Sequence, residues 1–207
     1  MLGSPHFNPG KLEIYTGPMR SGKTRELLNR VDKINYVNGY NVLLVKPKID
    51  TRDKEIKTRF GNLSFPCKFV DENNPEEILN IINEDDKIIA IDEANFFSDK
   101  IVEVVEKLLK QNRNVLIAGL DLNFRGEVFG PMGKLLARAD EVTKLKAVCC
   151  YKDCDQPATR TQRLVDGKPA SYDAPLVLIG DGNEGYEPRC LKHHKVPGKN
   201  KLKEQEN

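Results

Sequence analysis

The chain has 207 residues, which allows a sizeable hydrophobic core and favours one principal domain with a smaller second one. Its 33 basic and 31 acidic residues give a formal net charge of +2, which disfavours a dedicated nucleic-acid binder because such proteins usually carry a basic stripe. No apolar run reaches about eighteen residues, and the N-terminal segment lacks the charged-then-apolar order of a signal peptide, so we expect a cytoplasmic protein with no nucleic-acid or membrane partner.

The first apolar segment, Lys11–Thr16, predicts a strand that leads into a glycine-rich loop. The pattern G-x-x-x-x-G-K-[ST] is met by Gly17, Pro18, Met19, Arg20, Ser21, Gly22, Lys23 and Thr24. The glycines let backbone N–H groups curl around a triphosphate, Lys23 can reach the outer phosphates, and the Thr24 hydroxyl can bind magnesium. Apolar residues recur at helical spacing over Thr24–Val37, so we expect ATP at a helix N-terminus. A chance glycine-rich turn is the alternative.

Apolar runs and amphipathic stretches then alternate, which is typical of a parallel sheet covered by helices. We expect strands over Asn41–Val45, Lys87–Ile91 and Asn114–Gly119, and helices over Pro75–Asn83 and Ser98–Gln111. Ser98 can cap its helix, and Pro75 suits a first turn. The charged, weakly periodic segment between Lys46 and Pro66 predicts a mobile or partner-ordered loop. We therefore expect the fold class α/β, a parallel sheet of the P-loop (RecA-like) type with flanking helices.

An acidic pair stands at the end of the predicted strand Lys87–Ile91. Asp92 and Glu93 follow its apolar residues directly, so both lie at the C-terminal edge of the sheet, where ligands bind in parallel sheets. An aspartate at this place in a phosphate-loop protein commonly holds magnesium. Glu93 can take the proton of a hydroxyl acceptor, or activate water as in many ATPases. The alternative is that the pair merely begins a loop.

The last third of the chain has a different composition. After about Ala147, helical periodicity gives way to cysteine, proline, glycine and short β-prone pieces, so we expect a second domain. The predicted organisation is an N-terminal tail at 1–10, a nucleotide-binding domain at 11–146, a small zinc-binding β domain at 147–194 and a C-terminal tail at 195–207.

This second domain holds four of the five cysteines, and the odd total fits a metal site better than a disulfide framework. The candidate ligands are Cys149, Cys150, Cys154, Cys190, His193 and His194, more than one tetrahedral zinc needs. Their spacings suit a closed structural site, for which we favour Cys149, Cys154, Cys190 and His193. Cys150 and His194 are the alternatives at two positions. Buried cysteines beside surface histidines are the metal-free interpretation, and Cys67 is expected to be an ordinary residue.

These pieces resemble, in the same order, the zinc-containing cellular-type (type II) thymidine kinases, over about Lys11 to His194. Besides the phosphate loop with Glu26-Leu27, the motifs are Asp92-Glu93-Ala94-Asn95-Phe96-Phe97, Gly119-Leu120-Asp121-Leu122-Asn123-Phe124 with Phe129-Gly130, Ala147-Val148-Cys149, Ala158-Thr159-Arg160-Thr161-Gln162-Arg163, and Tyr186 near Cys190. The resemblance implies transfer of the γ-phosphate of ATP to the 5′-hydroxyl of thymidine, with deoxyuridine as a second substrate. It also implies a homotetramer and feedback inhibition by thymidine triphosphate (dTTP).

The resemblance assigns roles residue by residue. Glu93 matches the general base and Asp92 the magnesium-associated acid. The flexible segment near ATP matches Asp50, Thr51 and Arg52. Residues near the thymine match Met19, Phe124 and Phe129, although the spacing of the phenylalanines alone favours the core. The lasso loop over the nucleoside matches Leu176, Val177, Leu178, Ile179, Gly180 and Tyr186.

Some positions depart from the family pattern. Arg20 stands where an apolar residue is common, Asn95 replaces glutamine, and His193 replaces a cysteine. Two other functions compete with the kinase. A zinc-containing P-loop ATPase acting on nucleic acid is disfavoured by the balanced charge. A regulatory protein without catalysis is disfavoured because Lys23 and the acidic pair are intact.

Overall fold

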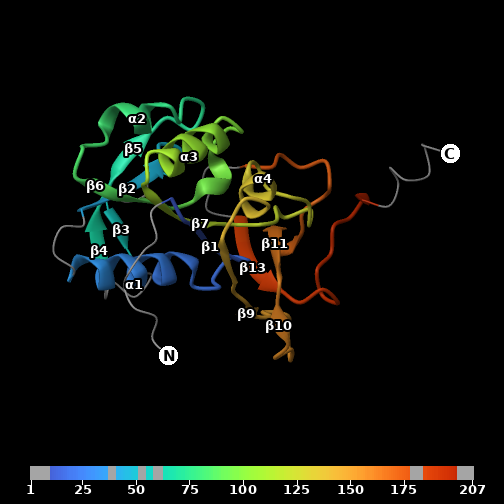
Figure 1. Ribbon diagram of the computed structural model, residues 1–207. Helices are drawn as coiled ribbons and strands as arrows, with labels where there is room; N and C mark the ends of the chain where they lie inside the picture. Colours follow the sequence, from blue (N-terminus) through green and yellow to red (C-terminus); the bar gives the residue numbers. More distant parts are fainter. Residues whose placement is uncertain (1–9, 37–40, 51–54, 58–62, 178–183, 200–207) are drawn as a thin grey trace. The chain divides into compact units, whose positions relative to one another are not determined.

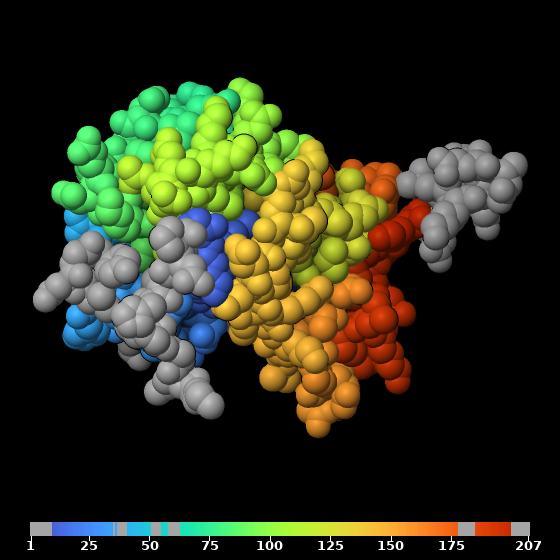
Figure 2. Space-filling view, in the orientation of Figure 1, coloured from blue at the N-terminus to red at the C-terminus, as the bar shows by residue number. Residues whose placement is uncertain are grey.

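The fold comes from a computed structural model, which describes residues 10–36, 41–50, 55–57, 63–177 and 184–199 (coloured in Figure 2). The chain divides into two compact units, each with its own β-sheets. The first unit comprises Met1–Thr16, Lys23–Gly119 and Gly130–Lys144. The second comprises Gly17–Gly22, Leu120–Phe129 and Leu145–Asn207, so it takes in two short segments from the first two thirds of the chain.

The first unit is built around a six-stranded parallel sheet with the order β5-β2-β6-β7-β1-β8 (Figure 1). Its strands are β1 (Leu12–Thr16), β2 (Asn41–Pro47), β5 (Lys68–Val70), β6 (Asp86–Ile91), β7 (Asn114–Gly119) and β8 (Glu141–Lys144). Its helices are α1 (Lys23–Asn35), α2 (Glu77–Ile81), the 3₁₀ helix η1 (Ala94–Phe96), α3 (Ile101–Lys110) and α4 (Met132–Leu136). This sheet confirms the predicted α/β class. The short edge strands β5 and β8 and helix α4 were not predicted.

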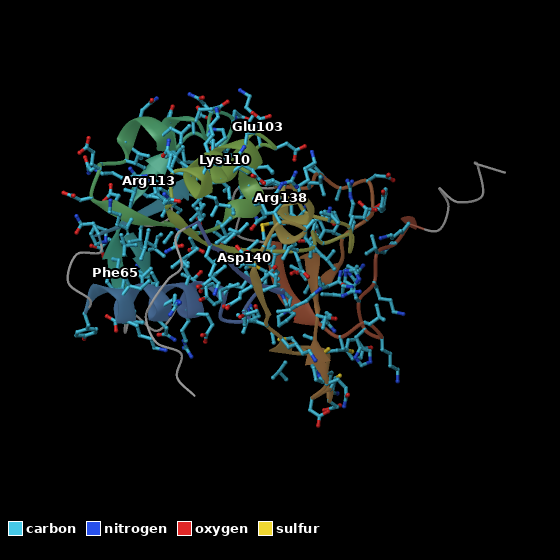
Figure 3. The ribbon with its side chains drawn as sticks, viewed as in Figure 1. Phe65, Glu103, Lys110, Arg113, Arg138 and Asp140 are labelled. Atoms are coloured by element: carbon cyan, nitrogen blue, oxygen red, sulfur yellow. The ribbon has the colours of Figure 1, made fainter. Side chains whose placement is uncertain are left out.

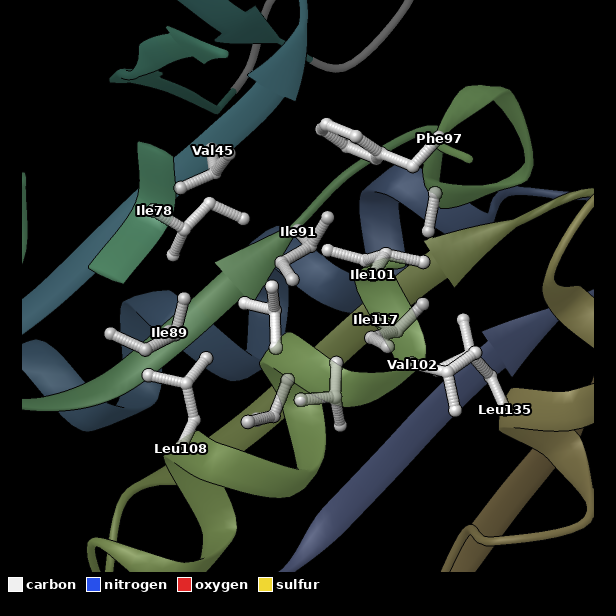
Figure 4. Close-up of a cluster of buried hydrophobic side chains, with 14 of the residues drawn as sticks. Val45, Ile78, Ile89, Ile91, Phe97, Ile101, Val102, Leu108, Ile117 and Leu135 are labelled. Atoms are coloured by element: carbon white, nitrogen blue, oxygen red, sulfur yellow. The ribbon is translucent and has the colours of Figure 1, made fainter. Parts of the chain in front are cut away.

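Helices cover both faces of the sheet because successive residues of each buried strand point to opposite sides. On one face, Ile88 and Ala90 of β6 pack against α1, through Leu27, Leu28, Val31 and Ile34. On the other face, Ile89 and Ile91 pack with α2, α3 and α4 (Figure 4). Each fully buried leucine or isoleucine contributes about 1.5–3 kcal/mol by leaving water.

Helix α3 shows the same division around its own axis. Its buried side consists of Ile101, Val102, Val104, Val105 and Leu108. Exposed charges such as Glu103 and Lys110 occupy the rest of its surface (Figure 3). The predicted cap of this helix is wrong. The helix begins at Ile101, and Ser98 contributes only its backbone carbonyl, which accepts the Ile101 N–H at 3.1 Å.

The segment expected to be a loop between Lys46 and Pro66 contains a short hairpin. Strand β3 (Glu55–Lys57) pairs antiparallel with β4 (Ser64–Pro66), and Ile56 is buried in the α1 side of the core. The loop prediction is therefore wrong for these residues, because one buried residue in three gives too short a pattern to detect. Residues 51–54 and 58–62 lie outside the described part.

The second unit consists of small antiparallel sheets. Strands β9 (Ala147–Val148) and β10 (Pro157–Ala158) pair with each other, and β11 (Arg160–Val165) lies between β12 (Lys168–Pro169) and β13 (Glu184–Arg189). The cysteine-rich part of the chain is thus β-structured, as expected. Among the described helices of both units, none has the length and apolar character needed to cross a bilayer.

Candidate active site

Three central strands end close together at one edge of the large sheet. Thr16, the last residue of β1, pairs in register with Gly119, the last residue of β7, and its hydroxyl donates to the Gly119 carbonyl at 2.9 Å. On the other side of β7, Ile91 of β6 pairs with Ile117. The phosphate-loop sequence follows β1 and the acidic pair follows β6. Both motifs therefore leave the C-terminal edge, where α/β proteins bind ligands.

Thr24 and Asp92 meet at this edge. The Thr24 hydroxyl, in the first turn of α1, lies 3.2 Å from each carboxylate oxygen of Asp92. Asp92 is only 4% exposed. Burial, reinforced by the nearby charge of Glu93, raises the pKa of Asp92 to about 7, although Lys46 and the Thr24 hydroxyl oppose the shift. A hydroxyl beside a buried carboxylate is the ligand pair that holds magnesium in phosphate-loop enzymes.

Lys46 is a charged residue of this region that sequence reasoning missed. It lies near the end of β2, where Val45 pairs with Ile91 and accepts the Asp92 N–H at 3.0 Å. The Lys46 ammonium lies 3.0 Å from Asp50, and both side chains are buried. Asp50, expected near ATP, is thus an ion-pair partner of Lys46, while Thr51 and Arg52 lie outside the described residues. The sequence signal that could have revealed Lys46 is its position as a charged residue at the end of an otherwise apolar strand.

Glu93 has an unusual backbone. Its φ of 52° and ψ of 39° place a non-glycine residue in the left-handed region, which costs on the order of 1–3 kcal/mol. The turn is held by η1, where the Phe96 N–H donates to the Glu93 carbonyl at 3.1 Å. Glu93 itself is half-buried, and Asn95, two residues on, is buried. Strain of this kind clusters at active sites, where the surrounding structure fixes a side chain in one direction.

The loop Gly17–Gly22 belongs to the second unit. A Cβ on Gly17, whose φ is +142°, would lie 2.3 Å from the Leu145 carbonyl oxygen, so the close backbone approach requires glycine. The Met19 N–H donates to the Thr161 hydroxyl of β11 at 3.1 Å. Arg20, which departs from the family pattern, also adopts a left-handed φ of 61°, and its exposed guanidinium reaches the Cys150 sulfur at 3.9 Å. Pro18 is buried and Ser21 half-buried.

The residues expected near the nucleoside have different environments within the second unit. Phe124 is 3% exposed, and Phe129 and Tyr186 are half-buried. Leu176 and Val177 are exposed at 40% and 37%, unusual for large apolar side chains. Leu178, Ile179 and Gly180 lie outside the described residues. Phe97 of the first unit belongs to the hydrophobic core.

Four side chains of the second unit form a compact metal-ligand set. The sulfurs of Cys149, Cys154 and Cys190 and a ring nitrogen of His193 all lie within 4.8 Å of one another. The His193 Nδ1 is 3.7 Å from the Cys149 sulfur and 3.4 Å from the Cys190 sulfur. Ligands of a tetrahedral zinc are about 3.6–3.8 Å apart, given bonds of about 2.0–2.3 Å. The set therefore fits zinc.

The surroundings also favour these four residues. Burial alone would raise the pKa of the Cys149 thiol, but backbone N–H groups of Cys190 and Tyr151 donate to the sulfur, and the pKa falls to about 6. The Tyr151 ring stacks on His193 with ring centroids 4.2 Å apart. Cys150 is exposed and outside the set, and His194 lies 2.8 Å from the Phe124 carbonyl through its Nε2. Cys67 is half-buried and joins no metal-ligand set among the described residues.

Comparison with known proteins shows the family of this chain. The thymidine kinase family model matches residues 10–194. A curated thymidine kinase from Coprothermobacter proteolyticus is 45% identical over 190 residues, which cover 92% of this chain and 93% of the relative. The resemblance drawn from the motifs is confirmed, and the chain belongs to the thymidine kinase family.

Proposed function

We propose that this chain transfers the γ-phosphate of ATP to the 5′-hydroxyl of thymidine, and that deoxyuridine is a second acceptor. The observation that carries the proposal is the Thr24–Asp92 pair at the sheet edge, in a chain of the thymidine kinase family. Lys23, at the start of α1, is buried. These residues are the parts that a phosphate-loop kinase needs to hold a nucleotide triphosphate.

The donor side follows from these positions. ATP binds with its phosphates on the backbone N–H groups of the loop Gly17–Gly22 and on Lys23. Thr24 and Asp92 would hold a magnesium ion, which neutralises charge on the β- and γ-phosphates when bound. Asp50, Thr51 and Arg52 are assigned to the same side, where Asp50 is fixed by its buried ion pair with Lys46.

On the acceptor side, Glu93 takes the proton of the 5′-hydroxyl as the phosphoryl group is transferred. Its left-handed backbone is consistent with this role, because strained residues cluster at active sites, although Asn112, Asp153 and Asp166 hold similar φ values in ordinary turns. Phe124, Phe129 and Met19 pack near the thymine. The nucleoside is covered by Leu176, Val177, Leu178, Ile179, Gly180 and Tyr186. Exclusion of water by this cover would limit hydrolysis of ATP.

The ligand set Cys149, Cys154, Cys190 and His193 holds a structural zinc, in this proposal, because all four positions are filled by protein groups and none is left for substrate. Cysteines that serve as metal ligands fit a reducing, cytoplasmic location. By the family resemblance, the proposal includes a homotetramer and feedback inhibition by dTTP. The nucleoside part of dTTP would occupy the thymidine site, and its phosphates would occupy the region of the ATP phosphates.

The purified protein with MgATP should convert thymidine, and deoxyuridine as the second acceptor, to the 5′-monophosphate. Purine nucleosides and ribonucleosides are the controls and should give no product. Failure to phosphorylate either deoxynucleoside overturns the proposal. ATP hydrolysis stimulated by single-stranded DNA or RNA, without nucleoside product, would instead support the competing ATPase.

The affinity for MgATP should weaken below about pH 7. In the nucleotide-free protein Asp92 is protonated below that pH, whereas magnesium needs the carboxylate, so binding releases a proton. The dissociation constant of MgATP should rise about 15-fold between pH 7 and 5.5, because single-proton linkage approaches tenfold per pH unit only well below the pKa. Isothermal titration at several pH values measures it.

Asp92→Asn is the matched control for this binding experiment, because any pH dependence of the dissociation constant that remains in the variant comes from ATP itself. Equal pH dependence of the dissociation constant in the wild type and the variant would contradict the linkage.

The free energy of unfolding of the nucleotide-free protein has the opposite pH dependence. Asp92 of the unfolded chain ionises near 3.8 but the folded protein resists ionisation until about 7, so the free energy of unfolding should fall as pH rises through this window.

A further inference from the structure

Phe124 lies in the second unit beside two arginines to which neither the family motifs nor the phosphate chemistry assigns a task. Arg163 of β11 is 1% exposed, although arginine is seldom fully buried. Its guanidinium lies 5.5 Å from the centre of the Phe124 ring and donates to the Pro175 carbonyl. A buried guanidinium is expensive to desolvate, so these contacts must be well formed for the fold to tolerate it.

Arg125 contacts the same ring and donates to the carbonyl that precedes Pro175. Its guanidinium lies 5.6 Å from the Phe124 ring centre and 4.6 Å from that of Tyr172, and it donates to the Ala174 carbonyl at 3.0 Å. Arg125 and Arg163 therefore bind successive carbonyls, Ala174 and Pro175, and both contact one aromatic ring. Leu176 follows directly, where the proposed nucleoside cover begins.

The loop that carries Phe124 has hydrogen bonds that do not involve the two guanidinium groups. The Asn123 side-chain oxygen accepts the backbone N–H groups of Arg125 at 2.8 Å and Glu127 at 3.2 Å. The Tyr172 hydroxyl donates to Glu127 at 3.0 Å. These bonds fix the loop without the guanidinium groups. The contacts of Arg125 and Arg163 therefore hold residues 174–175 in place relative to the loop.

We propose that Arg125 and Arg163 are positioning residues for the nucleoside: they fix Phe124 and the Ala174–Pro175 backbone relative to each other. Two guanidinium groups on successive carbonyls leave this backbone few alternative conformations. The direction in which the chain continues from Pro175 into Leu176 and Val177 is therefore defined. The inference rests on the proposed function and assigns specificity for the nucleoside, not chemistry, to the two arginines.

Arg163→Gln should raise KM for thymidine about tenfold, the order of effect expected from one charge-assisted hydrogen bond. KM for ATP should change less than twofold. Arg163→Lys keeps the charge and a donor nitrogen but not the planar fork, so it should recover part of the loss. Because Arg163 is buried and its variants can fail to fold, Arg125→Gln is measured alongside, with thermal melting and zinc content checked for each protein.

Arg138→Gln is the control and should leave both KM values unchanged. Within the described residues, the ion pair of Arg138 (labelled in Figure 3) is an exposed one with Glu106. The inference is overturned if folded Arg163 and Arg125 variants keep the wild-type KM for thymidine, or if KM for ATP rises equally. Absence of thymidine phosphorylation by the wild-type protein would instead refute the proposed function, so the two failures are distinguishable.

Discussion

Glu93→Gln is expected to lower kcat for thymidine phosphorylation by about 10²–10⁴-fold, the usual contribution of a general base. The amide keeps the size of the carboxylate but cannot accept the 5′-hydroxyl proton. KM for thymidine and for ATP should change little, because the substitution removes an interaction needed during transfer rather than binding. Steady-state kinetics with a direct assay of the monophosphate product measure the effect.

The same variant has a second readout. The charge of Glu93 contributes to the raised pKa of Asp92, so its removal should move the pH dependence of MgATP binding toward lower pH. Glu103→Gln is the matched control, since Glu103 is exposed on α3, and should leave both measurements unchanged. Near-normal turnover by Glu93→Gln would show that another group accepts the proton.

Cys190→Ser is expected to reduce bound zinc from about one per chain to almost none, because serine replaces a thiolate with a poor zinc ligand. Apparent zinc affinity in structural sites is about 10–16 kcal/mol, more than the whole stability of many domains. Loss of the metal should therefore unfold the β-structured second unit and abolish thymidine phosphorylation. Metal analysis and circular dichroism measure the two consequences.

Cys150→Ser is an unusually close control, because Cys150 is adjacent to Cys149 in sequence yet exposed and outside the ligand set. It should retain zinc and fold normally, whereas Cys154→Ser should behave like Cys190→Ser. Zinc lost from Cys150→Ser, or retained by Cys190→Ser, contradicts the ligand assignment.

Short-range patterns predicted much of this molecule. Apolar runs located β1, β2, β6 and β7 to within two residues at each end, because a strand buried on both faces needs a continuous apolar sequence. Edge strands such as β8, whose four residues are all exposed, have no such need and were missed. The cap of α3 was assigned wrongly, because Ser98 lies two residues before Lys100, which occupies the N-cap position.

The sequence by itself was enough to identify the family and to locate the phosphate-loop motif and the acidic pair, because each motif consists of neighbouring residues whose spacing the chemistry requires. Only the tertiary structure decided which groups share an environment. It separated Cys149 from Cys150, paired Lys46 with Asp50 at a place where its charge acts on Asp92, and placed Arg125 and Arg163 on one ring. Those relations depend on which face of a strand is buried and on contacts between residues far apart in the chain, and local residue patterns carry no record of either.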